Sequence, residues 1–286
     1  QKGRVVIITG ATSGLGKEAA KVLASKNATV IMAVRNTEKG ESVVNEIGKS
    51  FPNATIDVRK LDLNSLKSVK TFADGILSAY NRLDILINNA GVMACPFSKT
   101  EDGFEIQMGV NHLSHFALTG HLMPLLKKTK ASRIVATSSI AHRQGNINFD
   151  DINWKTRTYA TGKAYGDSKV ANLYFTYELA RKLKGDNNAP TVTAAHPGWT
   201  STDLQRHSLF FRILNPIFSQ NVENGVLPTL RAAIDDNAQS GDYYGPAGFQ
   251  EMKGAPVVVK SNERSHNEAN AKRLWDMSEK MTGVQF

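Results

Sequence analysis

Six apolar segments rich in β-branched residues recur along this chain, and amphipathic segments separate them. They show little alternation between apolar and polar residues, so each is expected to be a strand that is buried on both faces. Such strands, each followed by a segment of helical periodicity, are typical of a parallel sheet. The expected strands are 4–9, 29–34, 55–61, 84–88, 133–138 and 191–196. The sequence therefore predicts a doubly wound α/β fold, with a central parallel sheet flanked by helices.

The segments between these strands complete the predicted fold. Helices are expected at 14–26, 37–49, 65–80, 103–127, 159–184 and 222–234, with a short strand at 256–260 and a last helix at 265–281. No linker rich in proline or serine divides the 286 residues, and the 41% that are apolar are ample for one large core. We therefore expect a single domain over residues 1–286.

The single cysteine, Cys95, excludes an internal disulfide and favours a reducing compartment, so a cytoplasmic location is expected. The sequence contains no apolar stretch long enough to span a bilayer and no signal-peptide pattern at its start. The chain begins at Gln1 and not at methionine, which leaves open that an N-terminal anchor or tag has been removed.

The net charge of +9 raises the question of an anionic partner, such as a nucleic acid, a membrane surface or a small ligand. The charges are scattered along the chain. The densest group, Lys127, Lys128, Lys130 and Arg133, falls where a helix should end, so we interpret it as a solvated helix terminus. No contiguous basic patch with interleaved aromatics is visible, and nucleic acid is not an expected partner.

Three glycines, Gly10, Gly14 and Gly16, follow the first expected strand and open the first expected helix. N–H groups and the helix dipole at such a point can hold a pyrophosphate. Glycine is also common in ordinary turns, so the cluster alone leaves both interpretations open. Ligands of doubly wound sheets bind beyond the carboxyl ends of the strands, and this position favours the nucleotide.

Tyr165 and Lys169 lie four residues apart, and on a helix they share one face. A free tyrosine has a pKa of about 10 and is a poor base at neutral pH. A fixed positive charge nearby stabilises the phenolate, so we expect Lys169 to lower the pKa of Tyr165. The pair can then perform acid/base chemistry beside a bound nucleotide.

The glycine spacing T-G-x-x-x-G-x-G over residues 9–16 resembles that of the short-chain dehydrogenase/reductase family, and further motifs of this family follow in order. These are Asn88-Asn-Ala-Gly91, Asn111, Ser138-Ser139, Tyr165 with Lys169, and Pro197-Gly198. The resemblance extends over nearly the whole chain. It implies a Rossmann-type fold and hydride transfer between a nicotinamide and a carbonyl or alcohol.

The resemblance also implies residue roles. Tyr165 would exchange the proton, and Ser139 would polarise the carbonyl with Ser138 in support. Asn111 would break the regularity of its helix and anchor a water beside Lys169. Lys169 would also hold ribose hydroxyls. The cofactor-binding residues implied are Gly10, Thr12, Ser13, Gly14, Leu15, Gly16, Asp62, Leu63, Asn89, Ala90, Gly91, Tyr165, Lys169, Pro197, Gly198, Thr200 and Thr202.

The choice of cofactor depends on the end of the second strand. Residues 30–36 contain no acidic residue to hold a ribose 2′-hydroxyl, and Arg35 and Asn36 stand there instead. A guanidinium suits a 2′-phosphate, which favours NADP(H), although Arg35 could also be an ordinary surface arginine.

The separation between Ser139 and Tyr165 is 26 residues, longer than in the commonest members of the family. An insertion, Gln144 to Arg157 within the broader segment 142–158, is expected to form a surface loop beside the active site. Such a loop, with Asn-His-Leu-x-His-Phe from Asn111, is similar to retinol-dehydrogenase-like and WW-domain-oxidoreductase-like members. That subgroup is the one this chain most resembles.

Substrate and assembly are less constrained. The apolar segment 203–220 matches the family's substrate lid and suggests an apolar aldehyde or ketone, but it could instead contact a membrane or a second subunit. Family dimers pair the helices expected at 103–127 and 159–184, so a monomer and a homodimer both remain open. The histidines His112, His115, His142 and His196 show no metal-ligand spacing, and no metal is expected. A non-catalytic dinucleotide-binding redox sensor is the alternative function, although such a protein would be expected to have lost one of the four catalytic residues.

Overall fold

An eight-stranded sheet forms the centre of this computed structural model, which describes residues 1–199 and 220–286. Its strand order is β3-β2-β1-β4-β5-β6-β7-β8, and only the β7–β8 pair is antiparallel. The strands are β1 (Val5–Thr9), β2 (Thr29–Val34), β3 (Thr55–Lys60), β4 (Ile85–Asn88), β5 (Arg133–Thr137), β6 (Thr191–Ala195), β7 (Tyr243–Pro246) and β8 (Pro256–Val258). The predicted doubly wound α/β fold is confirmed.

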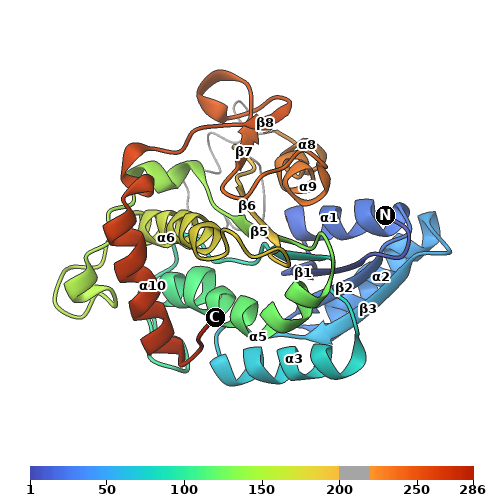
Figure 1. Ribbon diagram of the computed structural model, residues 1–286, viewed down its shortest axis with the longest axis horizontal. Coiled ribbons are helices and arrows are strands. Elements are labelled where there is room, and N and C mark those ends of the chain that lie inside the picture. The colour runs from blue at the N-terminus through green and yellow to red at the C-terminus, as the bar shows by residue number, and fades with distance from the viewer. Residues whose placement is uncertain (200–219) are drawn as a thin grey trace.

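Helices cover both faces of the sheet (Figure 1). One layer contains α1 (Gly14–Ser25), α2 (Thr37–Ser50), α8 (Val222–Gly225) and α9 (Leu227–Ile234). The opposite layer contains α3 (Leu66–Ala79), α4 (Ile106–Met108), the π-helical turn η1 (Gly109–Leu113), α5 (Ser114–Lys128), α6 (Thr161–Lys182) and α10 (Glu268–Thr282). Short 3₁₀ turns are η2 (Ile140–Gln144), η3 (Phe149–Asp151), η5 (Phe249–Glu251) and η6 (Glu263–His266).

Each face of the sheet has its own hydrophobic core. In β1, Val6 and Ile8 pack toward α1 and α2, whereas Ile7 packs toward α3 and α5. This follows from the two-residue period of a strand, which sends successive side chains to opposite faces. All five residues of β1 are buried, as expected for a central parallel strand.

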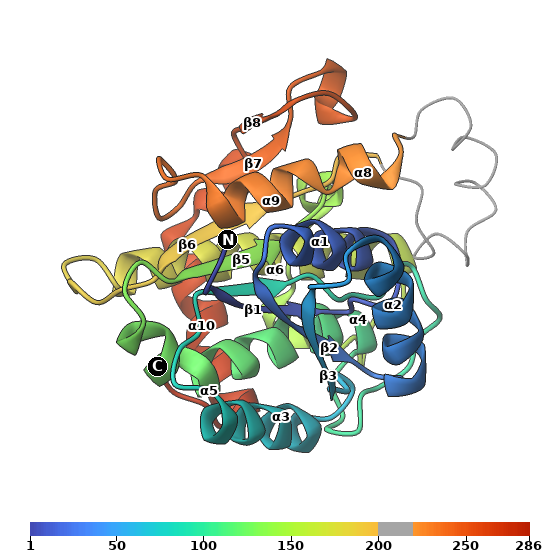
Figure 2. The ribbon, with the colours of Figure 1, turned by 90° about the vertical axis from the view of Figure 1, so that its right-hand side faces the viewer.

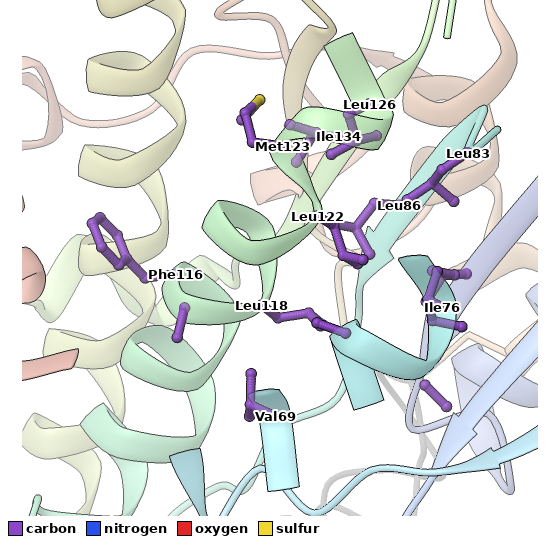
Figure 3. Packing of buried hydrophobic residues seen from close by; sticks show 14 of the residues in the cluster. Val69, Ile76, Leu83, Leu86, Phe116, Leu118, Leu122, Met123, Leu126 and Ile134 are labelled. Atoms are coloured by element: carbon purple, nitrogen blue, oxygen red, sulfur yellow. The ribbon is translucent and has the colours of Figure 1, made fainter. Parts of the chain in front are cut away.

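The larger core lies between the sheet and α3, α5, α6 and α10 (Figure 3). Leu122 of α5 lies beside Leu86 of β4, and Leu126 of α5 and Ile76 of α3 belong to the same core. Complete burial of such a side chain stabilises the fold by about 1.5–3 kcal/mol. These contacts hold α5 close to β4, and the residues that follow β4 contribute to the candidate site.

Three predicted elements differ in the structure. β3 is an edge strand with partly exposed residues, so its polar Asp57 and Arg59 are tolerated and pair at 2.7 Å. The expected helix at 103–127 is interrupted by the π-helical turn η1. The expected helix at 222–234 is divided at Val226, because Pro228 opens a new helix there.

The sequence did not indicate β7. Its residues, Tyr243-Tyr-Gly-Pro246, contain a glycine and a proline that are typical of turns. The strand nevertheless pairs with both β6 and β8.

The basic group at the end of α5 is only partly a helix terminus. Lys127 and Lys128 do lie in its last turn. Arg133 is instead the buried first residue of β5, and it donates a hydrogen bond to the carbonyl oxygen of Asp235 and pairs with Asp236 at 3.8 Å. The interpretation of Arg133 as a solvated cap was wrong.

The insertion at 144–157 is not a simple surface loop. Ile147 and Ile152 are buried in a small core with residues of α4 and α6, and the Trp154 ring packs edge-on against Tyr159 at 5.3 Å. The apolar side chains of the insertion supply this anchoring.

In the described ranges, no helix is both long and apolar enough to cross a bilayer.

Candidate functional site

The predicted site residues gather along the carboxyl ends of β1, β4, β5 and β6. The order of strands reverses between β1 and β4, since β2 lies on one side of β1 and β4 on the other. Such a switch point opens a crevice where ligands bind in doubly wound sheets. The glycine turn, the Asn89–Gly91 turn, the serine pair and the Pro197-Gly198 segment each follow a strand end directly, so the sheet sets their relative positions. Asn111 lies in η1, and Tyr165 and Lys169 lie on α6.

The turn between β1 and α1 requires glycine at three of its positions. Gly10 and Gly14 have φ values of +68° and +51°, a region that favours glycine. A Cβ on Gly10 would lie 2.9 Å from the Cβ of Ala90, and one on Gly16 would lie 2.5 Å from the Gly10 carbonyl oxygen. A side chain at either position would therefore displace the turn after β4 or the Gly10 carbonyl.

Thr12, Ser13 and Leu15 complete this turn. Ser13 is the N-cap residue of α1, and Leu15 is buried against the core. Among the residues that the structure describes, no side chain caps the first turn of α1, so its N–H groups can donate to an anion. The glycine cradle and these N–H groups together fit the pyrophosphate of a dinucleotide.

Thr9 joins β1 to the segment after β4, a role that the sequence reading missed. Its Oγ1 accepts from the N–H groups of Asn89 and Ala90, each at 2.9 Å, and lies 2.9 Å from Nε2 of His115. The Asn89 side chain donates in return to the Thr9 carbonyl oxygen at 2.8 Å. Thr9 is completely buried, so these bonds fix the shape of the Asn89–Gly91 turn.

His115 has a defined tautomer in this network. Its Nδ1 lies 3.2 Å from the Asn111 carbonyl oxygen, which can only accept, so Nδ1 carries the proton. Nε2 then accepts from the Thr9 hydroxyl. Burial lowers the pKa of His115 to about 4, which keeps the ring neutral.

Asn111 lies in the π-helical turn η1, where the regular helix is broken. Its Oδ1 accepts from the Val92 N–H at 2.8 Å, and its Nδ2 donates to the Val92 carbonyl oxygen and to Ser168 Oγ, both at 2.9 Å. A Cβ on Gly91 would lie 3.0 Å from Asn111 Oδ1 and 3.6 Å from Lys169 Nζ. Asn111 therefore lies close to Lys169, and its amide connects η1 to α6.

Ser138 and Ser139 take different roles after β5. Ser138 is buried and donates from Oγ to the Lys169 carbonyl oxygen at 2.9 Å, so it anchors α6. Ser139 is the N-cap residue of η2, and its Oγ accepts from the Ala141 N–H at 3.2 Å. The Ser139 hydroxyl also acts on the Tyr165 phenol, because it lowers the pKa of that phenol. Ser139 is therefore the serine of this pair that influences the tyrosine.

Tyr165 and Lys169 share one face of α6, as their spacing predicted. Lys169 Nζ lies 5.5 Å from the centroid of the Tyr165 ring and donates to the Thr137 carbonyl oxygen at 3.1 Å. Burial lowers the pKa of Lys169 to about 8.

The pKa of Tyr165 differs from the prediction. Burial of its hydroxyl raises the pKa to about 12, and Ser139 only partly opposes this rise. Lys169 Nζ lies 5.5 Å from the ring centroid and donates to the Thr137 carbonyl oxygen, and the effect of burial on the pKa dominates. In this structure the phenol is therefore an acid with its proton in place at neutral pH.

The predicted adenosine-side residues lie after β2 and β3. Arg35 is exposed, and none of the acidic side chains in the described ranges pairs with it. Asn36 has a local role, since its side chain caps α2 by accepting from the Lys39 N–H at 2.8 Å. Asp62 accepts from the Asn64 N–H at 3.0 Å, and Leu63 is buried. Of these four side chains, Arg35 is the one that presents an exposed charged group, its guanidinium, without an acidic partner in the described ranges.

The segment after β6 contains Pro197 and Gly198, while Thr200 and Thr202 lie outside the described residues, as does nearly all of the predicted lid at 203–220. Gly198 has a φ of +66°. His196 is buried and lies 2.9 Å from Glu251 through Nε2, so it bonds locally as the sequence reading expected. No group of histidine, cysteine or acidic residues in the described part of the chain is arranged to hold a metal.

Two further residues of α6 support the site and were missed. Ser168 receives the Asn111 amide and donates to the Tyr165 carbonyl oxygen at 2.8 Å. Asn172 donates to the Thr137 carbonyl oxygen at 2.9 Å, beside Lys169. The sequence gives one signal for these two residues, which is a small polar side chain on the otherwise apolar face of a helix.

The cluster combines a protonated phenol, a serine hydroxyl that lowers its pKa, a buried ammonium and a glycine cradle at the carboxyl end of the sheet. This arrangement can hold a dinucleotide phosphate and deliver a proton to an oxygen beside it.

Comparison with known proteins agrees with this geometry. The sequence profile described as short chain dehydrogenase matches residues 4–209. Human retinol dehydrogenase 11 and retinol dehydrogenase 12 are each 43% identical, over 99% of this chain and 86% and 88% of their own lengths. A solved protein from Mycobacterium paratuberculosis is 40% identical with a TM-score of 0.85, covering 100% of this chain and 95% of that one. An Escherichia coli short chain dehydrogenase complexed with NADPH is 28% identical with a TM-score of 0.68, covering 85% of this chain and 95% of its own.

Proposed function

This chain belongs to the short-chain dehydrogenase/reductase family, in its retinol-dehydrogenase-like subgroup, and we propose that it is an NADP(H)-dependent oxidoreductase of the carbonyl reductase or alcohol dehydrogenase type. The observation that carries the proposal is the convergence of Ser139, Tyr165, Lys169 and Asn111 beside the glycine cradle. We further propose that residues 1–286 act as one catalytic domain.

A bound nicotinamide would supply the hydride for a carbonyl carbon, or accept it from an alcohol. Tyr165 supplies the proton to the carbonyl oxygen, and its raised pKa keeps that proton on the phenol at neutral pH. The Ser139 hydroxyl lowers the pKa of the Tyr165 phenol, and we propose that both hydroxyls donate to the same carbonyl oxygen. General acid help of this kind contributes about 10²–10⁴ in rate.

Lys169 and Asn111 position these groups. Lys169 Nζ carries three donors and uses one on the Thr137 carbonyl, so the others are available to ribose hydroxyls or a water. Asn111 is held rigidly by Val92 and Ser168, which fixes the polar surroundings of Lys169. A water held between Asn111 and Lys169 would return the proton to Tyr165 after each turnover.

Preference for NADP(H) is supported by Arg35. Its exposed guanidinium at the end of β2 can pair with a 2′-phosphate, and residues 30–36 contain no carboxylate to repel that phosphate. Two similar solved proteins are described as complexed with NADP and with NADPH.

An apolar carbonyl or alcohol is the proposed substrate. The relatives named above are retinol dehydrogenases, and retinol is an apolar alcohol. The segment 203–220, which holds Leu209, Phe210 and Phe211, has a composition that suits such a substrate.

The test is loss of NADPH absorbance with purified protein and a panel of apolar aldehydes and ketones, retinal included, alongside NADH. Tyr165→Phe is the matched control, because it keeps the ring and removes only the hydroxyl. We expect turnover with NADPH that Tyr165→Phe abolishes. Tight NADPH binding with no turnover of any carbonyl would instead favour the sensor, and no NADPH binding would refute the proposal.

A further inference from the structure

The loop between β7 and β8, residues 247–255, lies against the segment that follows β6. The Trp199 N–H donates to the Met252 carbonyl oxygen at 2.8 Å. A Cβ on Gly198 would collide with that oxygen and would lie 2.9 Å from the Glu251 carbonyl oxygen. This loop belongs to the hairpin at the top of Figure 2, and through these contacts it holds the backbone of the Pro197-Gly198 segment.

Glu251 links this loop to two different parts of the site. Its Oε2 lies 2.9 Å from Nε2 of His196, the residue just before Pro197. Its Oε1 lies 2.9 Å from the guanidinium of Arg143, which belongs to η2. We call these two contacts the histidine arm and the arginine arm.

The histidine arm orients the backbone beside Pro197. Nδ1 of His196 accepts from the Gly198 N–H at 3.2 Å, so the proton of the neutral ring is on Nε2 and is donated to Glu251. The ring is completely buried, and Gly245 leaves just enough space for it, since a Cβ there would collide with the imidazole. The position of Glu251 is thereby transmitted to the Gly198 N–H.

The arginine arm reaches the other side of the site. η2 begins directly after Ser139, and the Ser139 carbonyl oxygen receives the His142 N–H at 3.0 Å and lies 2.7 Å from His142 Nδ1. Arg143 is the next residue. A contact at Arg143 therefore constrains the turn that presents the Ser139 hydroxyl to Tyr165.

The backbone at this position is strained. Gln250 and Glu251 have φ values of +49° and +59°, in a region that side-chain-bearing residues rarely adopt. Consecutive residues of this kind persist only where the surrounding contacts determine them, and they cluster at functional sites. In this conformation the Glu251 carboxylate lies between His196 and Arg143.

We propose that Glu251 is a positioning residue, which fixes the Pro197-Gly198 segment and the Ser139 turn relative to each other. The inference rests on the proposed function, because that function places the Pro197-Gly198 segment beside the nicotinamide and the Ser139 turn beside the substrate carbonyl. By this account Glu251 touches neither cofactor nor substrate. It determines how far apart they are held, through its two arms.

Three variants separate the arms. Glu251→Ala removes both, Glu251→Gln keeps an oxygen that accepts from His196, and Arg143→Gln removes only the ionic contact. Glu268→Ala is the matched control, since this exposed glutamate of α10 lies 4.0 Å from the Arg181 guanidinium of α6 and away from the site. For each variant we would measure the NADPH dissociation constant by fluorescence, kcat and KM for one apolar aldehyde, and amide hydrogen exchange across residues 196–199.

We expect Glu251→Ala to weaken NADPH binding, to accelerate exchange across 196–199 and to lower kcat/KM by about 10-fold to 100-fold, as small misplacements of reacting groups do. Glu251→Gln should recover NADPH binding, whereas Arg143→Gln should keep NADPH binding and lower kcat. A purely structural glutamate would lower the melting temperature alone.

If the wild type turns over a carbonyl but Glu251→Ala shows the same kinetics and the same amide hydrogen exchange as Glu268→Ala, the inference is overturned. If the wild type neither binds NADPH nor reduces a carbonyl, the proposed function fails and the inference fails with it. The two failures are therefore distinguishable.

Discussion

Replacing Thr9 with valine tests how the switch point between β1 and β4 is held together. Valine has nearly the shape of threonine but lacks the hydroxyl, so the change removes hydrogen bonds and little volume. Thr9 is completely buried, and its Oγ1 receives the N–H groups of Asn89 and Ala90 and bonds His115, all at 2.9 Å. The expected damage is thus confined to three polar groups.

The magnitude follows from these three bonds. Each contributes about 1 kcal/mol, and a buried group left without a partner costs more, so the free energy of unfolding should fall by roughly 3 kcal/mol. For a chain of this size that corresponds to a melting temperature lower by roughly 6 °C. NADPH binding should weaken as well, because the Asn89–Gly91 turn loses its anchor.

Urea unfolding of Thr9→Val and Thr9→Ser, with NADPH titration of both, measures this effect. Thr9→Ser keeps the hydroxyl and loses one methyl group, which costs about 1 kcal/mol. Thr9→Val should therefore be the less stable of the two and the weaker binder. Equal stability of the two variants would refute the idea that the Thr9 hydroxyl organises the turn.

Three further outcomes are expected. Arg35→Glu should shift the ratio of NADPH to NADH dissociation constants by about 10-fold or more in favour of NADH, since a charge-assisted bond to phosphate contributes about 1.5–3 kcal/mol. An unchanged ratio would show that Arg35 does not contact the cofactor. Gly16→Ala should abolish NADPH binding, because the added Cβ would lie 2.5 Å from the Gly10 carbonyl oxygen. Gly48→Ala is the control, since Gly48 has open space around it and the variant should bind NADPH normally. Normal binding by both variants would contradict the proposed glycine cradle. Burial lowers the pKa of His115 from 6.5 to about 4, so the unfolded chain binds more protons than the folded chain between these pH values. The stability that the neutral ring contributes is therefore fully present above pH 6.5 and is lost as the pH falls to 4. The loss in the free energy of unfolding is up to about 3 kcal/mol. Urea unfolding of the wild type and His115→Gln across this range measures it, and identical pH slopes would contradict the assignment.

The parts of the fold that follow from local patterns were predictable from the sequence. β2 has the bounds that its apolar run predicted, and α1 begins at the predicted Gly14, because burial on both faces and a glycine turn leave unambiguous local signals. β7 was missed because Gly245 and Pro246 are poor strand formers, and pairing with β6 outweighs that preference. The π-helical turn around Asn111 was visible only through the family resemblance, since its residues keep a helical pattern.

The candidate site divides in the same way. Ser139, Tyr165 and Lys169 were found through motifs and do converge, but their roles remain predictions. The pKa of Tyr165 could not be read from spacing, because burial of the hydroxyl outweighs an ammonium that bonds elsewhere. Thr9 and Glu251 were missed because each acts on residues distant in the sequence, 80 positions away for Asn89 and 55 for His196.

The central claim is direct hydride transfer to a carbonyl carbon, with Tyr165 supplying the proton. Its most direct test is a reaction with NADPH deuterated at C4 of the nicotinamide, in each of its two stereochemical forms, followed by mass spectrometry of the alcohol product. The account predicts that one form alone delivers its deuterium to the carbinol carbon, and that Tyr165→Phe yields no labelled alcohol. Alcohol that carries deuterium from neither form, or labelling that persists in Tyr165→Phe, would contradict it.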